Sequence, residues 1–213
     1  MTTPDRGTMG RRSLLRRAFM TGAAMIASGC SASPPRRPAP SVLLAYFSRP
    51  GENYHYGGRR RLAVGNTEVL GQMIARRIRC EVHRIQPADP YPDDYEATVQ
   101  RNVREQDAGA RPAIAGPLPA IQRYDTVLLG SPIWNVRAPM IMSTFTEGLD
   151  FSGKTVFPLT TYAMSGLGTT ERDYAASCPG ATLGEGLAVR GEEVADADAE
   201  VESWLRRVGL LTS

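Results

Sequence analysis

The feature that most constrains the fold is an uninterrupted apolar run at residues 42–47, Val-Leu-Leu-Ala-Tyr-Phe. A run of this length without alternating polar residues is typical of a strand buried on both faces of a parallel sheet. Further along the chain, apolar residues recur at the spacing of a helix: Val69, Leu70, Met73, Ile74 and Ile78. The sequence therefore predicts a buried strand, a loop and an amphipathic helix, in that order.

The predicted helix begins at Gly65-Asn66-Thr67. Asn66 or Thr67 is the expected N-cap, and Glu68 suits the first turn because its charge complements the helix dipole. The unpaired N–H groups of a helix start also favour an anion such as a phosphate. An ordinary helix cap would use the same residues, so the neighbouring loops are needed to choose between the two interpretations.

Predicted strands and helices alternate along the rest of the chain. Further strands are expected at 80–85, 124–130, 155–161 and 181–189, the last broken by Gly184 and Gly186. Further helices are expected from Asp94, from Ala138-Pro139, from Thr170 and around residues 201–208. This alternation predicts a parallel sheet wound by right-handed crossovers.

Two of these helices carry local signals. In the helix from Asp94, Tyr95, Val99 and Val103 form one apolar face. In the helix from Thr170, Thr170 and Asp173 have the spacing of a capping box.

The basic character of the chain comes from its first 40 residues. They contain seven arginines and one acidic residue, whereas residues 41–213 have a formal net charge of −3. Nucleic-acid binding needs a basic face on the folded domain itself, so this distribution argues against it.

Residues 1–30 resemble a twin-arginine signal peptide of the lipoprotein type. Arg11-Arg12 precedes a short apolar run, and that run ends at the lipobox-like site Ala27-Ser28-Gly29-Cys30. The run is too short to span a bilayer. A general signal peptide, or a basic tail with a chance cysteine, remains the alternative. Residues 31–40 are rich in Pro, Ser and Arg and indicate an extended tether to a domain at 41–213.

Three loops that follow predicted strands carry unusual residues: 48–67, 131–137 and 162–168. Ligands of open α/β sheets bind outside the carboxyl ends of the strands. The first loop offers a phosphate site at the helix start, the second an aromatic plane at Trp134, and the third serine and glycine that allow close backbone approach. Flavin mononucleotide (FMN) suits this set better than a dinucleotide, because no Gly-x-Gly-x-x-Gly follows the first strand.

The chain resembles a flavodoxin, of the branch close to flavodoxin-like quinone reductases. The resemblance covers residues 42 to about 208. It rests on the segments 44–48, 65–67, 90–95, 130–134, 138–139, 150–154 and 165–168. It implies an α/β three-layer sandwich with a five-stranded parallel sheet of order 2-1-3-4-5.

The resemblance also implies where FMN binds. Ser48, Asn66 and Thr67 would hold the phosphate, and the ring would lie between the loops 132–136 and 161–168, with Trp134 and Tyr162 as its candidate faces. The full set of expected cofactor-binding residues is Ser48, Gly65, Asn66, Thr67, Pro132, Ile133, Trp134, Asn135, Val136, Thr161, Tyr162, Ser165 and Gly166.

These features predict an exported, lipid-anchored FMN protein that carries electrons to or from a redox partner protein. The alternatives are an NAD(P)H-dependent FMN reductase that acts on a small quinone or flavin, and a module that has lost FMN and is filled by the loop 48–64. That loop is either a flap over the ligand or a solvated insertion. The sequence indicates no catalytic acid or base and no metal site, since His55 has no second His or Cys at ligand spacing. Cys80 and Cys178 precede opposite edge strands and are not expected to form a disulfide.

Overall fold

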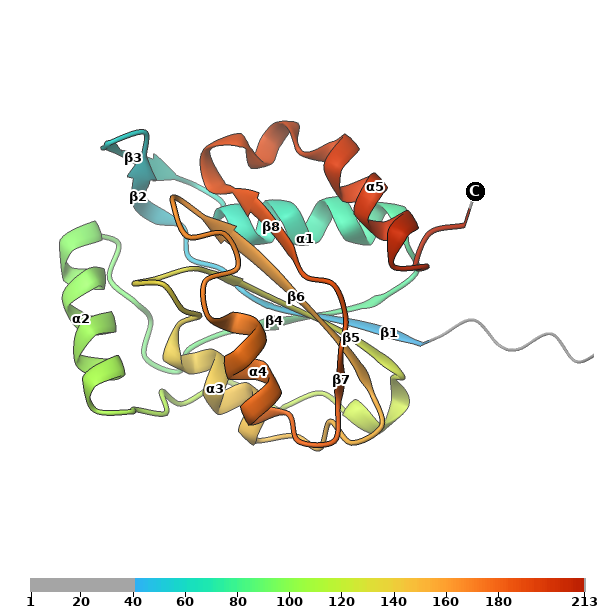
Figure 1. Cartoon of the computed structure of the whole chain (residues 1–213). Coiled ribbons are helices and arrows are strands. Elements are labelled where there is room, and N and C mark those ends of the chain that lie inside the picture. The colour runs from blue at the N-terminus through green and yellow to red at the C-terminus, as the bar shows by residue number, and fades with distance from the viewer. Residues whose placement is uncertain (1–40, 213) are drawn as a thin grey trace, which may run out of the picture. The chain divides into compact units, whose positions relative to one another are not determined.

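The computed structural model describes residues 41–212, which form a parallel sheet covered by helices on both faces (Figure 1). The strands of the sheet are β1 (Val42–Phe47), β4 (Glu81–Ile85), β5 (Thr126–Pro132), β6 (Thr155–Tyr162), β7 (Thr182–Leu183) and β8 (Leu187–Arg190). The helices are α1 (Asn66–Arg77), α2 (Tyr95–Asp107), α3 (Met140–Glu147), α4 (Thr170–Ser177) and α5 (Asp198–Arg207), with short 3₁₀ turns η1 (Ile121–Arg123) and η2 (Gly191–Asp196). The strand order β4-β1-β5-β6-β7 confirms the predicted order 2-1-3-4-5.

The central strand β1 is buried on both faces, as its apolar run predicts. Leu43, Ala45 and Phe47 pack into one core cluster with α3 and α4, whereas Val42, Leu44 and Tyr46 pack into a second cluster with α1 and α5. Figure 1 shows α1 and α5 on one side of the sheet and α3 and α4 on the other. The fold is therefore three-layered, with β1 in its middle.

The fifth strand is split into β7 and β8, and both pieces pair with β6. Pro158 of β6 lies between the two paired stretches and has no N–H to donate. Gly184 lies against the ring of Phe157, so closely that a Cβ there would overlap the ring. The break expected at Gly184 and Gly186 is therefore confirmed, and its cause lies in the neighbouring strand.

The segment 48–64, predicted as a loop, contains a β-hairpin. Strands β2 (Gly51–His55) and β3 (Gly58–Leu62) pair antiparallel and are joined by Tyr56 and Gly57. Both residues have positive φ, 46° and 86°, which suits a two-residue hairpin turn. The sequence predicted a loop here, either a flap or a solvated insertion, and gave no indication of the two strands. Figure 1 shows the hairpin at the end of the sheet where the parallel strands have their carboxyl ends.

Two details of the helices differ from prediction. In α2 the buried residues are Thr98 and Asn102, whereas Val99 and Val103 are 37% and 40% exposed. The expected capping box of α4 does not form, because Thr169 is the N-cap and its hydroxyl pairs with Asp173 at 2.6 Å. The hydroxyl of Thr170 donates instead to the carbonyl of Leu167.

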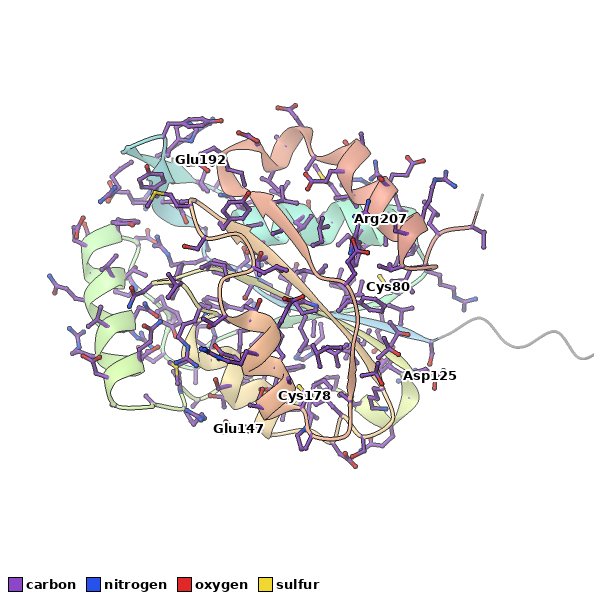
Figure 2. All side chains as sticks on the ribbon, viewed as in Figure 1. Cys80, Asp125, Glu147, Cys178, Glu192 and Arg207 are labelled. Carbon is purple, nitrogen blue, oxygen red and sulfur yellow. The ribbon has the colours of Figure 1, made fainter. Side chains whose placement is uncertain are left out.

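Cys80 and Cys178 are both free thiols and belong to core clusters on opposite faces of the sheet (Figure 2). Burial raises the pKa of both thiols, that of Cys178 to about 11. Within residues 41–212, no helix has the length and apolar character needed to cross a bilayer. The predicted signal peptide, Cys30 and the tether lie outside the described residues.

Candidate cofactor site

The start of α1 presents free backbone donors. Gly65 is the N-cap, so the predicted caps Asn66 and Thr67 were wrong by one position or more. The N–H of Glu68 donates to the hydroxyl of Ser48 at 3.0 Å and to the carbonyl of Gly65. The N–H groups of Asn66 and Thr67 have no acceptor among residues 41–212. Two free donors at the positive end of a helix dipole form a potential anion site.

Ser48 reaches this helix start although 16 residues separate it from Gly65. The hairpin projects away from the sheet, which brings its two ends together. A Cβ on Gly65 would overlap the hydroxyl of Ser48 and lie 2.5 Å from the carbonyl oxygen of Arg49. Glycine is therefore required at position 65, and the insertion leaves the predicted phosphate residues in contact.

Thr67 connects the helix start to β6. Its side chain is 2% exposed, and its hydroxyl lies 2.7 Å from that of Thr161. Asn66 is half-buried, and its amide lies close to Gly191 of η2. The side chain of Asn66 therefore lies near the surface of the site, whereas the side chain of Thr67 is buried.

The loop after β5 is a tight turn that packs on the loop after β6. Trp134 and Arg137 exchange backbone hydrogen bonds of 2.8 and 3.3 Å around Asn135 and Val136. Asn135 and Val136 have φ of 49° and 64°, and this conformation is strained for a β-branched valine. The carbonyl of Val136 accepts from Thr169 N–H at 2.9 Å. The two loops expected to enclose a ring are therefore joined side by side.

Trp134 is packed edge-on against the core. Its ring makes T-shaped contacts with Phe47 and Tyr91, with centroids 5.6 and 5.0 Å apart. Tyr162 is half-buried at the end of β6, with the guanidinium of Arg190 6.0 Å from its ring centroid. Both predicted ring faces border the site, and Trp134 is the more rigidly held.

Two cavities lie at this end of the sheet. The cavity at the helix start has a volume of about 110 Å³ and brings together Asn66, Thr67, Pro132, Ile133, Trp134, Thr161 and Tyr162 from the predicted set. A second cavity of about 320 Å³ is bordered by the α2 residues Val99 and Val103 and by Asn135. Both are bordered by Arg49, Asn53, Tyr95, Ile133 and Trp134. We call the two cavities together the crevice.

The other predicted residues lie around the crevice. Ser48 and Gly65 contact the start of α1 and each other, and the Ser48 hydroxyl accepts from Glu68 N–H. Val136 and Ser165 are exposed on the paired loops, and Gly166 accepts a hydrogen bond of 3.0 Å from the Thr160 hydroxyl. The structure thus groups seven of the predicted residues at the helix start, Tyr162 of the third loop among them, and leaves Ser165 and Gly166 of that loop outside the lining.

Sequence reasoning missed a set of lining residues at the crevice: Arg49, Asn53, Tyr54, Tyr95, Gly191 and Glu192. Arg49, Asn53 and Tyr54 belong to the segment that was expected to be a flap, and its aromatic and basic residues were the available signal. Glu192 follows the fifth strand, and no sequence pattern identified it.

The hairpin crosses the crevice between α2 and η2. Its α2 side is anchored by Glu52 N–H to the carbonyl of Asp93 at 2.8 Å and by the ion pair of Arg59 with Glu96 at 2.8 Å. Among residues 41–212, its tip is held by one hydrogen bond, 3.3 Å long, from Tyr56 N–H to the carboxylate of Glu192, the residue labelled in Figure 2. The anchoring is therefore strong at α2 and weak at η2.

The residues present fit a phosphorylated planar cofactor. The free N–H groups of Asn66 and Thr67 suit a phosphate, and the adjoining aromatic residues suit a ring. Small-molecule pockets usually measure about 300–1,000 Å³, so the 110 Å³ at the helix start is too small for a whole cofactor, and the hairpin tip beside it is held by the hydrogen bond to Glu192. Among the described residues, no group of His, Cys, Asp and Glu has the arrangement of a metal site.

Comparison with known proteins agrees with this fold. The profile of a flavodoxin family, Flavodoxin_4, matches residues 61–208. A crystal structure of a candidate flavoprotein from Bacteroides uniformis is 30% identical, with a TM-score of 0.64, and covers 79% of this chain and 99% of that chain. A candidate flavoprotein from Bacteroides eggerthii is 27% identical, with a TM-score of 0.62, and covers 80% and 98%.

A flavoprotein from Lactobacillus acidophilus, solved in complex with FMN, is 17% identical with a TM-score of 0.55 and covers 78% of this chain and 99% of that chain, a likeness of fold alone. No functionally curated protein matches the chain.

Proposed function

The chain belongs to the flavodoxin family, and from that premise we propose that it binds FMN in the crevice and carries electrons. The observation that supports this most is the start of α1, where two free N–H groups lie beside the Ser48 hydroxyl and within reach of an adjoining aromatic site. FMN presents a phosphate and a planar ring, which match these two parts.

When bound, FMN supplies the redox chemistry, and the chain supplies binding and electrostatics. The N–H groups of Asn66 and Thr67 would hold the phosphate, with Ser48 beside them. Ile133 and Trp134, and Tyr162 at the end of the neighbouring strand β6, would bind the ring and exclude water from it.

The visible absorbance spectrum of the full chain, purified without added cofactor and then titrated with FMN, tests this proposal. A flavin spectrum, with FMN rather than riboflavin released on denaturation, is expected. A protein that stays colourless and does not bind added FMN would support the third interpretation, a family member whose hairpin fills the site.

A second candidate function is a reductase, and the 320 Å³ cavity is the observation that favours it. This cavity is bordered by Val99, Val103 and Trp134, it adjoins the helix-start cavity, and its size suits a small planar ligand such as a nicotinamide or a quinone. Rapid mixing of the FMN-loaded protein with NADPH, with and without a quinone, separates the two functions. Fast bleaching of the flavin by NADPH indicates a reductase, and no bleaching indicates a carrier with a protein partner.

We also propose that the chain is exported by the twin-arginine route and anchored to the membrane only through a lipid on Cys30. Support comes from the order of Arg11-Arg12, a short apolar run and Cys30 in the sequence. A route that passes folded proteins would keep a cofactor that is inserted in the cytoplasm. Replacing Arg11 and Arg12 by lysine keeps the charge, so normal export of that variant in a cell fractionation would refute the twin-arginine route.

A further inference from the structure

Arg49 is a buried cation at the crevice. Its residue is 8% exposed, and it borders both cavities. Its guanidinium donates to the backbone carbonyls of Pro92 at 2.7 Å, Asp93 at 3.2 Å and Glu52. No carboxylate oxygen among residues 41–212 lies within 4.0 Å of its nitrogens. Its Nε is buried and has no hydrogen-bond partner among the same residues.

A buried charge without a paired counter-charge is costly, so a negative charge that enters the site would be stabilised by it. Burial lowers the pKa of Arg49, although nearby Asp93 and Glu52 raise it, and an arginine remains charged at neutral pH. The nearest acidic groups are engaged elsewhere. Asp93 pairs with Arg61, and the Glu52 carboxylate accepts from Tyr95 N–H at 3.2 Å.

The inserted hairpin creates this arrangement. It begins two residues after Arg49, supplies the carbonyl of Glu52 and is hydrogen-bonded to the segment that supplies the carbonyls of Pro92 and Asp93. Without the hairpin, the guanidinium would lose one of its ligands and the cover that separates it from solvent. A charge in a poorly solvated site acts over longer distances than one at the surface.

We infer that the hairpin and Arg49 together form a potential-tuning device: the fixed positive charge raises the reduction potential of FMN in the crevice. The inference rests on the proposed function. Uptake of two electrons and one proton leaves the flavin ring with one negative charge, and a nearby cation stabilises that form over the oxidised one. The electrons come from the donor in the cell, a protein or a reduced nicotinamide, and from dithionite in the test.

The test measures the two-electron potential of FMN bound to the full chain, by dithionite titration against a reference dye. Arg49→Met removes the charge, Arg49→Lys keeps it, and Arg60→Met removes the same charge from the exposed strand β3 as a matched control. We expect Arg49→Met to lower the affinity for reduced FMN relative to oxidised FMN at least tenfold, a fall of about 30 mV for two electrons. Arg49→Lys and Arg60→Met should each change that ratio less than threefold.

An Arg49→Met protein that binds oxidised FMN and keeps the natural potential overturns the inference. Failure of the natural chain to bind FMN overturns the proposed function instead. Should Arg49→Met not fold, Arg49→Gln takes its place, because its amide keeps a hydrogen-bond donor without the charge, and the same fall of about 30 mV is expected. An unchanged potential in that variant contradicts the inference. Besides Arg49, the charged or titratable groups that face Arg49 or the crevice are Glu52, Tyr54, Asp93, Asp94, Tyr95, Tyr162 and Glu192.

Discussion

At the scale of single residues, the site depends on close approaches at the helix start. Gly65 follows the hairpin in the sequence. Its lack of a side chain leaves room for Ser48 and Arg49, which precede the hairpin. Thr67 is fixed by Thr161, so its side chain contributes rigidity and its N–H faces the proposed phosphate. Asn66 is therefore the residue where a change of charge reaches the phosphate with little disturbance to the core.

Asn66→Asp places a carboxylate of equal size beside the proposed phosphate. Like charges at close range in a poorly solvated site repel by about 3 kcal/mol, so the Kd for FMN should rise roughly a hundredfold. Quenching of FMN fluorescence measures it. Gln72→Glu adds the same charge to the exposed face of α1 and should leave the Kd within threefold. Equal affinities in the two variants would place the phosphate elsewhere.

His83 gives the stability a defined pH dependence. It stacks on Phe145 with ring centroids 5.6 Å apart, and burial lowers its pKa below 6.5, although Glu81 raises it. The unfolded chain then binds more protons than the folded one, so the free energy of unfolding falls as the pH drops below about 6.5. Urea unfolding between pH 5.5 and 7.5 should show this slope, and His83→Phe should reduce it. His55→Phe is the control, and a slope unchanged by His83→Phe contradicts the assignment.

At the scale of elements, the strands and helices with strong periodicity were predictable, and the hairpin was not. β1 and α1 carry their pattern within a few residues. The sequence of β3, Gly-Arg-Arg-Arg-Leu, gives no strand signal. Arg59 and Arg61 are paired by Glu96 and Asp93, which lie more than 30 residues away in the sequence. The apolar face of α2 was a misleading signal of core packing, because its residues Val99 and Val103 border a cavity rather than the core.

The hairpin should control entry of the cofactor. Its tip is held by Glu192, whose carboxylate also borders the helix-start cavity. Glu192→Ala removes both the acceptor and a negative charge near the proposed phosphate, so FMN should associate at least threefold faster in stopped-flow fluorescence. Glu193→Ala removes an exposed neighbouring carboxylate and serves as the control. An association rate that is the same in both variants would mean that the tip does not limit entry.

At the scale of the whole molecule, the sheet order brings the loops after β1, β5 and β6 together at the carboxyl ends of the strands. Of the predicted site, the sequence revealed the parts that lie on these loops, because each follows a recognisable buried strand. The parts contributed by the hairpin, α2 and η2 depend on long-range packing and have no local pattern. Arg49 belongs to both parts of the site. It follows the predicted residue Ser48 in the sequence, and it is buried by the hairpin, which was not predicted.

The most direct test of FMN binding at the start of α1 compares FMN with riboflavin, which differ only by the phosphate. Both should be titrated against the full chain by fluorescence quenching at the same ionic strength. If the N–H groups of Asn66 and Thr67 hold the phosphate, FMN should bind at least a hundredfold more tightly than riboflavin, about 2.7 kcal/mol. Equal affinities, or binding of neither, would contradict the account.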